Sequence, residues 1–191
     1  MSIMIKKQMV GVLLTVVMCL AGCSNSTIEA DTLTLSKDGT ATYSIVSDFS
    51  EDYYNLEELM TMAQEEVDDY GSGVQITESV VEDGVLHFRY AFDSLLHYAE
   101  FMETTCFQGT VADAIKKGYQ SDLQLTSAKA DAAISLKDET IQGCHIFVWT
   151  EDVAVKCNKS ILYYSDNLTL NGRAGAVPKE GSEGPYYVVY K

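Results

Sequence analysis

A short apolar segment near the N-terminus decides which part of this chain can fold as a domain. Lys6 and Lys7 precede an apolar run over Met9–Leu20, which is followed by Ala21, Gly22 and Cys23. A helix over this run is too short to cross the ~30 Å hydrocarbon core of a bilayer. A basic stretch, a short apolar run and small residues before a cysteine are typical of a lipoprotein export signal. We therefore predict that residues 1–22 are a signal peptide that is removed.

Cleavage at this point would make Cys23 the first residue, with a thiol and a new amine for fatty acylation. Two or more fatty chains anchor a protein stably, whereas one binds only marginally. We predict a lipid anchor on Cys23, on the extracytoplasmic face of the cell membrane, and a lipidated tether over residues 23–30. The seven residues after Cys23 reach about 25 Å when fully extended, so the domain would stay close to the membrane.

Length and charge bound what the rest of the chain can be. Removing 22 of the 191 residues leaves 169, which fits one domain over residues 31–191. The removed segment holds two lysines and no acid, so the formal charge falls from −15 to −17. Such a surface repels nucleic acid and anionic lipid headgroups. Because 47% of the chain is hydrophobic, the acidity belongs to a folded domain and does not indicate disorder.

A hairpin with a three-residue loop is predicted for residues 32–46. Lys37-Asp38-Gly39 supplies the turn, with Gly39 in the left-handed conformation. This loop sets Leu35 opposite Ala41 and Leu33 opposite Tyr43, which keeps apolar side chains on one face. A two-residue loop would instead set both leucines opposite polar residues.

A second hairpin and three helices complete the predicted N-terminal part. The hairpin joins Val74–Val81 to Val85–Phe92 through a loop of Glu82-Asp83-Gly84. Its predicted pairs are Val80 with Leu86, Ile76 with Tyr90 and Val74 with Phe92. Helices are predicted from Asn55, with Glu58 in a capping box, to Gly71; over residues 93–103; and from Thr110, with Asp113 as its reciprocal cap, to Gly118. The order hairpin, helix, hairpin, helix suggests a degenerate repeat.

The chain from Leu123 onward is predicted to be all β. Short apolar runs occur at 123–125, 132–136, 143–149, 153–157, 161–164, 168–170 and 186–190. The glycine-rich stretch 171–184 is predicted to be a mobile loop. The fold class is therefore α+β, with two or three helices packed on antiparallel sheet and a β-rich C-terminal half.

Three cysteines, Cys106, Cys144 and Cys157, remain after Cys19 is lost with the signal and Cys23 is lipidated. If strands 143–149 and 153–157 form a hairpin with Val148 opposite Val153, then Cys144 lies opposite Cys157 at a distance a disulfide can bridge. Either a Cys144–Cys157 disulfide forms, or two small apolar thiols simply pack in the sheet. If the disulfide forms, Cys106 is the unpaired thiol.

No motif in the chain identifies a reaction, and we predict no catalytic, cofactor or metal residue. His87, His97 and His145 lack a second ligand at metal spacing. A Cys106–histidine nucleophile pair is disfavoured, because its neighbours predict burial of that thiol. The acidic runs 48–52 and 65–69 lack the ligand spacing of a calcium loop. The C-terminal tyrosines Tyr163, Tyr164, Tyr186, Tyr187 and Tyr190 could form a binding platform, but sheet packing is the favoured interpretation.

Several segments resemble an uncharacterised family of small surface lipoproteins from Gram-positive, Clostridia-type bacteria. The residues that carry the resemblance span roughly 32–119 and are turn, cap and packing residues: Lys37-Asp38-Gly39, Phe49, Tyr53-Tyr54, Leu56, Glu65-Glu66, Tyr70, Tyr98, Phe101, Phe107-Gln108-Gly109-Thr110, Ala114, Gly118 and Tyr119. The resemblance implies a fold and an envelope location, and no activity.

The leading hypothesis is a non-catalytic surface binding or accessory module of the cell envelope, with a protein or glycan partner left open. The alternatives are an envelope enzyme with an unrecognised active site and a purely structural envelope component. A cleft with convergent titratable groups would favour the enzyme, and an exposed tyrosine-lined surface would favour binding.

Overall fold

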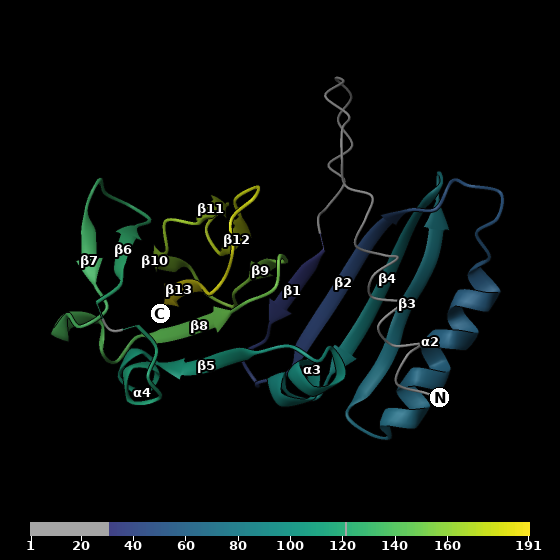
Figure 1. Ribbon diagram of the computed structural model, residues 1–191, viewed down its shortest axis with the longest axis horizontal. Coiled ribbons are helices and arrows are strands. Elements are labelled where there is room, and N and C mark those ends of the chain that lie inside the picture. Colours follow the sequence, from purple (N-terminus) through teal and green to yellow (C-terminus); the bar gives the residue numbers. More distant parts are fainter. Residues whose placement is uncertain (1–30, 121) are drawn as a thin grey trace.

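The computed structural model describes residues 31–120 and 122–191. The predicted signal peptide, the tether and Cys23 therefore lie outside the described residues. Within that part of the chain, three α-helices and thirteen strands form two sheets (Figure 1). The predicted α+β class, with helices on largely antiparallel sheet and a β-rich C-terminal half, is confirmed.

Sheet A contains strands from both ends of the chain. In spatial order it comprises β11 (Leu168–Asn171), β12 (Gly175–Pro178), β9 (Ala154–Lys156), β1 (Thr32–Leu35), β2 (Ala41–Asp48), β4 (Val85–Phe92) and β3 (Val74–Glu82). Strands β1 and β9 pair in parallel, and the other neighbours are antiparallel. The parallel pair joins the N-terminal hairpins to the C-terminal strands in one sheet.

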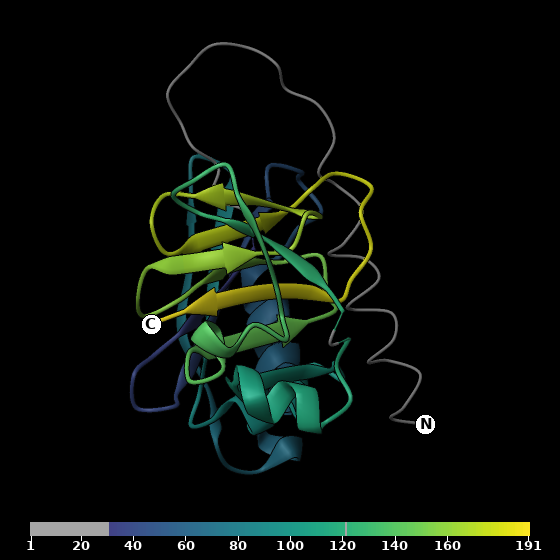
Figure 2. The ribbon, with the colours of Figure 1, turned by 90° about the vertical axis from the view of Figure 1, so that its left-hand side faces the viewer.

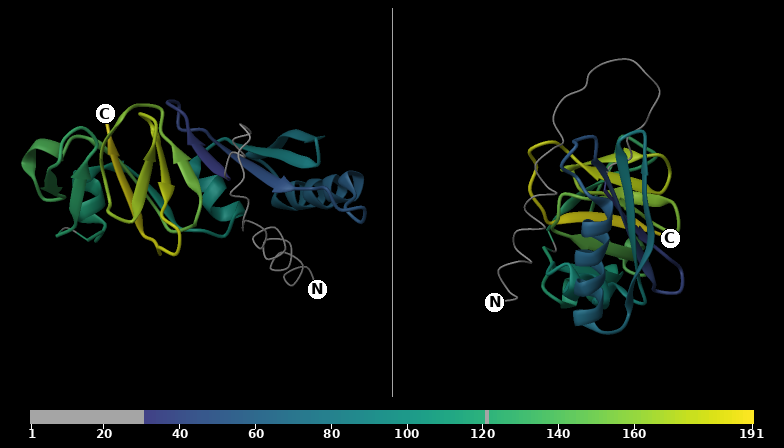
Figure 3. Two further views of the ribbon diagram at one scale, coloured as in Figure 1. Left: turned by 90° about the horizontal axis from the view of Figure 1, so that it is seen from above. Right: turned by 90° about the vertical axis from the view of Figure 1, so that its right-hand side faces the viewer.

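Sheet B and two of the three α-helices, the second and third elements of which are given below as α2 and α3, cover sheet A. In spatial order sheet B comprises β5 (Cys106–Thr110), β8 (His145–Trp149), β13 (Tyr186–Tyr190), β10 (Ile161–Tyr164), β6 (Gln124–Ser127) and β7 (Ala133–Ser135). The helices are α2 (Leu56–Tyr70), α3 (Leu95–Phe101), α4 (Val111–Lys116) and the short 3-10 helix η1 (Glu139–Ile141). The fold is elongated, with α2 at one end and β6, β7 and η1 at the other (Figure 3), and Figure 2 views the latter end.

One hydrophobic core runs through both halves of the molecule. Leu33, Tyr43 and Phe88 of sheet A belong to the same buried cluster as Ala63 and Val67 of α2. The cluster also contains alternate residues of sheet B: Phe147, Trp149, Tyr186, Val188 and Tyr190. Helices α2 and α3 and sheet B thus cover successive stretches of one apolar face of sheet A.

A second, smaller cluster lies on the far face of sheet B. Ile146, Val148, Tyr187 and Val189 point away from sheet A and pack with Val111 and Ala114 of α4. Strands β8 and β13 are therefore buried on both faces, which explains why β13 reads Tyr-Tyr-Val-Val-Tyr without polar alternation. Tyr186, Tyr187 and Tyr190 are buried, so sheet packing, rather than a binding platform, is the role of these three tyrosines.

The first hairpin forms as predicted. Leu33 pairs with Tyr43 and Leu35 with Ala41, and the N–H of Ser36 donates to the carbonyl of Thr40 at 3.0 Å across the loop. Gly39 has φ +88°, the left-handed conformation that this turn requires.

The second hairpin closes with a tighter turn than predicted. Val74 pairs with Phe92 and Ile76 with Tyr90 as expected, but Val81, not Val80, pairs with Leu86. Asp83 and Gly84 both have positive φ, 51° and 78°, as in a two-residue Asp-Gly turn. A register shift between Ile76 and Glu78 absorbs the extra residue as a β-bulge.

The helix starts predicted from capping residues are confirmed. The Asn55 side chain accepts from the N–H groups of Glu57 (2.9 Å) and Glu58 (3.2 Å) at the start of α2. At α4, the Thr110 hydroxyl donates to the Asp113 carboxylate (2.6 Å) and accepts from the Asp113 N–H (3.1 Å), a reciprocal cap.

The predicted hairpin of strands 143–149 and 153–157 is wrong. Strand β8 pairs with β5 and β13 in sheet B, whereas β9 pairs with β1 and β12 in sheet A. The connection between them carries the chain from one sheet to the other. The predicted loop 171–184 is wrong in part, because it contains β12, which pairs with both β11 and β9.

Candidate functional site

The most exposed large apolar side chain in the described part of the chain is Tyr53, at 75%. It lies in the aromatic loop, defined here as residues 49–54, which connects β2 to α2. The Phe49 and Tyr54 rings stack with centroids 4.9 Å apart, and the Tyr53 ring lies 4.7 Å from that of Tyr54. A tyrosine ring at 75% exposure, packed against one of two stacked rings, forms an aromatic surface that can contact a partner.

The sheet and the loop's own backbone hold this loop in place. The Phe49 N–H donates to the carbonyl of Gly84 in the β3–β4 turn at 2.7 Å, and the Tyr54 N–H donates to the Glu51 carbonyl at 3.0 Å. Ser50 lies directly over Gly84, where an added Cβ would approach the Ser50 Cβ to 3.1 Å. The loop is therefore anchored on the β3–β4 turn and presents Tyr53 outward.

Carboxylates surround the exposed ring. The Asp48 carboxylate accepts from the Ser50 N–H at 3.0 Å, and hydrogen bonding to Ser50 lowers the pKa of Asp48, so this group is ionised at neutral pH. The pKa of the Tyr53 phenol is raised, first by its hydrogen bond to Tyr54 and further by the charges of Glu51 and Asp48. The phenol of Tyr53 thus lies in a negative field.

The aromatic loop lies at the end of sheet A where the described chain begins. Thr32 pairs with Ser44, and the N–H of Val46 donates to the Asp31 carboxylate at 3.0 Å. Phe49 follows three residues after Val46, which is about 10 Å along an extended strand. In Figure 1 the chain enters β1 at the same upper edge at which β2 leaves the sheet.

A cluster of two buried phenols and two half-buried carboxylates joins sheet A, α3 and the β8–β9 connection. The Tyr98 hydroxyl donates to the Glu151 carboxylate at 2.5 Å, and the Tyr43 hydroxyl donates to the Asp31 carboxylate at 3.3 Å. The two phenol rings meet edge to face with centroids 5.9 Å apart. Burial raises the pKa of both carboxyl groups, although hydrogen bonds partly oppose it. Burial also raises the pKa of both phenols.

The buried thiols near the core are held protonated. Burial raises the pKa of Cys106 to about 11, with the charge of Glu151 contributing, and burial raises the pKa of Cys157 to about 12. A thiol is nucleophilic as the thiolate, so neither group is activated at neutral pH. We therefore interpret the hydrogen-bonded cluster of Asp31, Tyr43, Tyr98 and Glu151 as internal polar packing.

The structure brings Cys144 and Cys157 to different cores. Cys157 is buried in the cluster between the sheets, whereas Cys144 packs against the cluster under α4. The register that would have opposed them does not exist, because β8 and β9 belong to different sheets. Cys106, Cys144 and Cys157 are all free thiols in the structure, which corresponds to the alternative of unpaired thiols, although Cys144 and Cys157 are not opposed in one hairpin as that alternative assumed.

The three histidines lie in three separate environments. His87 is on the open face of sheet A, opposite Val46 and Val80, and His145 stacks on Tyr190 with centroids 5.6 Å apart. His97 contacts the Tyr70 hydroxyl through Nδ1 at 2.9 Å, and the same hydroxyl donates to Glu100 at 2.9 Å. Because the hydroxyl donates its proton to Glu100, the geometry assigns the shared proton of the other contact to His97 Nδ1.

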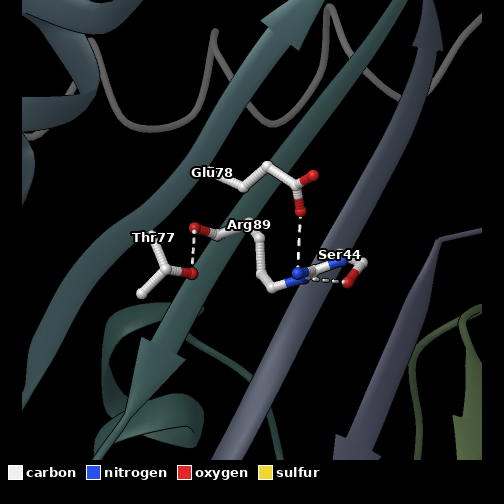
Figure 4. Close-up of polar contacts among 4 residues, drawn as sticks. All are labelled: Ser44, Thr77, Glu78 and Arg89. Atoms are coloured by element: carbon white, nitrogen blue, oxygen red, sulfur yellow. Dashed lines mark hydrogen bonds and ion pairs between the residues drawn. The ribbon is translucent and has the colours of Figure 1, made fainter.

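The open face of sheet A is polar and internally paired. Arg89 forms an ion pair with Glu78 at 2.7 Å and donates through Nε to the Ser44 hydroxyl at 3.0 Å (Figure 4). The Thr77 hydroxyl donates to the Arg89 carbonyl at 3.3 Å. The Arg89 charge is therefore already matched within the fold.

Over residues 31–120 and 122–191, no three histidine, cysteine or acidic side chains gather as metal ligands would. None of the helices in this range is long and apolar enough to span a membrane. Comparisons with protein-family models, curated proteins and solved structures found no match to this chain.

Sequence reasoning did not identify the aromatic loop as a surface. The sequence predicts packing roles for Phe49, Tyr53 and Tyr54, because residue spacing alone does not tell which ring faces solvent. The contacts of Asp31 and Glu151 with buried tyrosines were not predicted either. For Glu151 the sequence contains a signal, because Glu151 and Asp152 interrupt two strongly apolar strands at a single short connection.

Proposed function

We propose that this protein is a lipid-anchored extracytoplasmic lipoprotein that acts as a non-catalytic binding or accessory module of the cell envelope, with the aromatic loop as its contact surface. The lipid anchor is supported by the sequence Leu20-Ala21-Gly22-Cys23 after the basic and apolar stretch. The observation that carries the binding role is the 75% exposure of Tyr53 on a stacked aromatic support.

A binding role agrees with how the reactive side chains are used. The Cys106 and Cys157 thiols are held protonated by burial, and the phenols of Tyr43 and Tyr98 donate to carboxylates within the fold. The two thiols are protonated and the two phenols are hydrogen-bonded within the fold, whereas Tyr53 presents its ring to solvent.

Site-specific photo-crosslinking in intact cells tests the contact surface. A benzophenone amino acid in place of Tyr53 is expected to give a discrete cross-linked species. The matched control is the same amino acid in place of Leu96, an exposed side chain (64%) on α3 at the opposite end of sheet A. The same product from both positions, or none from position 53, would refute the aromatic loop as the contact surface.

A further inference from the structure

The aromatic loop combines exposed ring surface with unpaired negative charge. Five carboxylates lie in it or in the adjoining strand ends and turn: Asp48, Glu51, Asp52, Glu82 and Asp83. The segments 46–56 and 81–85 contain no lysine or arginine. The ion pairs of the described residues lie elsewhere, at Arg89–Glu78, Lys116–Asp113 and Lys137–Asp122, so none of the five carboxylates is neutralised within this fold.

The strand register brings Asp48, Glu82 and the β3–β4 turn together beside the aromatic loop. Asp48 and Glu82 pair with the same residue, Val85, from opposite sides of β4. The backbone bond from Phe49 to Gly84 then sets the aromatic loop against the turn that carries Asp83. Glu51 and Asp48 act on the Tyr53 phenol itself.

A cationic ligand can interact favourably with both the exposed ring and the carboxylates. The face of an aromatic ring carries negative electrostatic potential and attracts ammonium and guanidinium groups. Neighbouring carboxylates add charge pairing and, for arginine, two-point hydrogen bonding. A neutral glycan could stack on Tyr53 and donate hydroxyls to these carboxylates, but it carries no charge to pair with them, and anionic lipid headgroups would be repelled by them.

We propose that the aromatic loop and the β3–β4 turn form a docking surface for a basic segment of a partner protein. An arginine or lysine side chain of the partner stacks on Tyr53 while its neighbours pair with Glu51, Asp52 and Asp83. This inference rests on the proposed binding function and names the chemistry of the partner.

Binding of an arginine-containing peptide to the full-length protein in neutral detergent tests this surface. The probe is a fluorescent peptide of alternating arginine and glycine, followed by anisotropy, and the matched peptide carries citrulline, which is neutral, at each arginine. The arginine peptide is expected to bind, more weakly as salt rises, and the citrulline peptide is expected to bind at least tenfold more weakly.

Variants separate the ring from the charges. Tyr53→Ala should weaken binding of the arginine peptide about fivefold, the size of an exposed cation–π contact. The pair Glu51→Gln and Asp52→Asn should weaken it about tenfold and reduce its salt dependence. The controls are Leu96→Ala for the exposed apolar side chain, and Glu180→Gln with Glu183→Gln for an equal loss of exposed charge away from the loop. Unchanged melting temperatures verify that each variant is folded.

Three outcomes overturn the proposal. Equal losses in the loop and control variants would mean that the peptide responds only to net charge. Binding of a neutral oligosaccharide that is lost in Tyr53→Ala, without binding of the arginine peptide, would make the loop a glycan surface and leave the proposed binding function standing. No binding of the peptide would refute the basic partner, whereas the proposed contact surface fails only if position 53 gives no specific cross-link.

Discussion

Individual carboxyl groups in this protein serve opposite electrostatic roles. Asp31 and Glu151 are half-buried, and this burial raises the pKa of each, so the fold shifts both toward the neutral form. At the surface, hydrogen bonds to Ser50 and Thr110 lower the pKa values of Asp48 and Asp113. The acidic composition alone does not distinguish these groups, because the difference comes from burial and hydrogen bonding.

Glu151→Gln is predicted to change how stability depends on pH. The pKa of Glu151 is higher in the folded than in the unfolded chain, so its contribution is most favourable below pH 4.5, the unperturbed value, and is lost as the pH rises through the folded pKa. Glutamine keeps an acceptor for the Tyr98 hydroxyl and carries no charge. The variant should gain stability relative to the wild type as the pH rises.

Urea unfolding of both proteins at several pH values from 4 to 9 measures this difference. The control is Asp152→Asn at the exposed neighbouring position, which should leave the pH profile of the wild type unchanged. A Glu151→Gln profile parallel to that of the wild type would mean that this carboxyl is not buried as the structure has it.

At the scale of secondary-structure elements, the contact of His97 with Gly73 and Tyr70 fixes the packing of α2, β3 and α3. The ring of His97 on α3 lies over Gly73, the residue before β3, where an added Cβ would come within 2.6 Å of the imidazole. Tyr70, at the end of α2, bridges His97 and Glu100. Gly73 also has φ +90°, a conformation that disfavours other residues.

A double-mutant cycle tests this contact. Gly73→Ala should destabilise the protein by roughly 2–4 kcal/mol, the sum of left-handed strain and overpacking against His97. Because His97→Ala removes the ring, the pair Gly73→Ala and His97→Ala should cost less than the sum of the single variants by more than about 1 kcal/mol. Gly71 also has positive φ but has open space around it, so Gly71→Ala and His97→Ala should be additive. Additivity in both cycles would contradict the packing of His97 over Gly73.

Local patterns predicted the elements well and their distant partners poorly. The first hairpin was predicted to the residue, because the turn chemistry and the apolar faces agree on one register. In the second, the Asp-Gly turn closed with two residues and the bulge near Thr77 restored the predicted pairs beyond it. A bulge is not visible in side-chain alternation until the partner strand is known.

The error over β8 and β9 has a physical cause. Strands close in sequence often form a hairpin, but each of these strands lies between two strands from distant parts of the chain: β8 between β5 and β13, and β9 between β1 and β12. Such partners are distant in sequence, so spacing carries no information about them. Strands β5 and β12 were not predicted, because glycine and proline are more typical of loops than of strands. These strands contain Gly109, Gly175 and Pro178.

For the whole molecule, a shared sheet and a continuous core link the two halves. The parallel β1–β9 pair and the cluster shared by α2, sheet A and sheet B join the N-terminal hairpins to the C-terminal strands. Cys157 lies in this cluster as a small apolar side chain, and Cys106 packs against it.

Alkylation of the native protein tests this arrangement of thiols. With pKa values of about 11 and about 12, Cys106 and Cys157 should react with iodoacetamide at pH 8 on the order of a hundredfold more slowly than in the urea-unfolded chain. Mass spectrometry of the peptides follows each cysteine separately. All three cysteines should be alkylated in the unfolded chain without prior reduction. A Cys144–Cys157 linkage in freshly purified protein would contradict the separation of β8 from β9.

The lipid anchor is the central claim about the whole molecule, and fatty-acid labelling tests it most directly. Cells expressing the wild type, Cys23→Ala or Cys19→Ala would be grown with a clickable palmitate analogue. Cys19→Ala is the matched control, because it removes a cysteine from the predicted signal peptide and leaves Leu20-Ala21-Gly22-Cys23 intact. The wild type and Cys19→Ala should be labelled, and Cys23→Ala should be unlabelled and retain its first 22 residues. Labelling that persists in Cys23→Ala would contradict the lipid anchor.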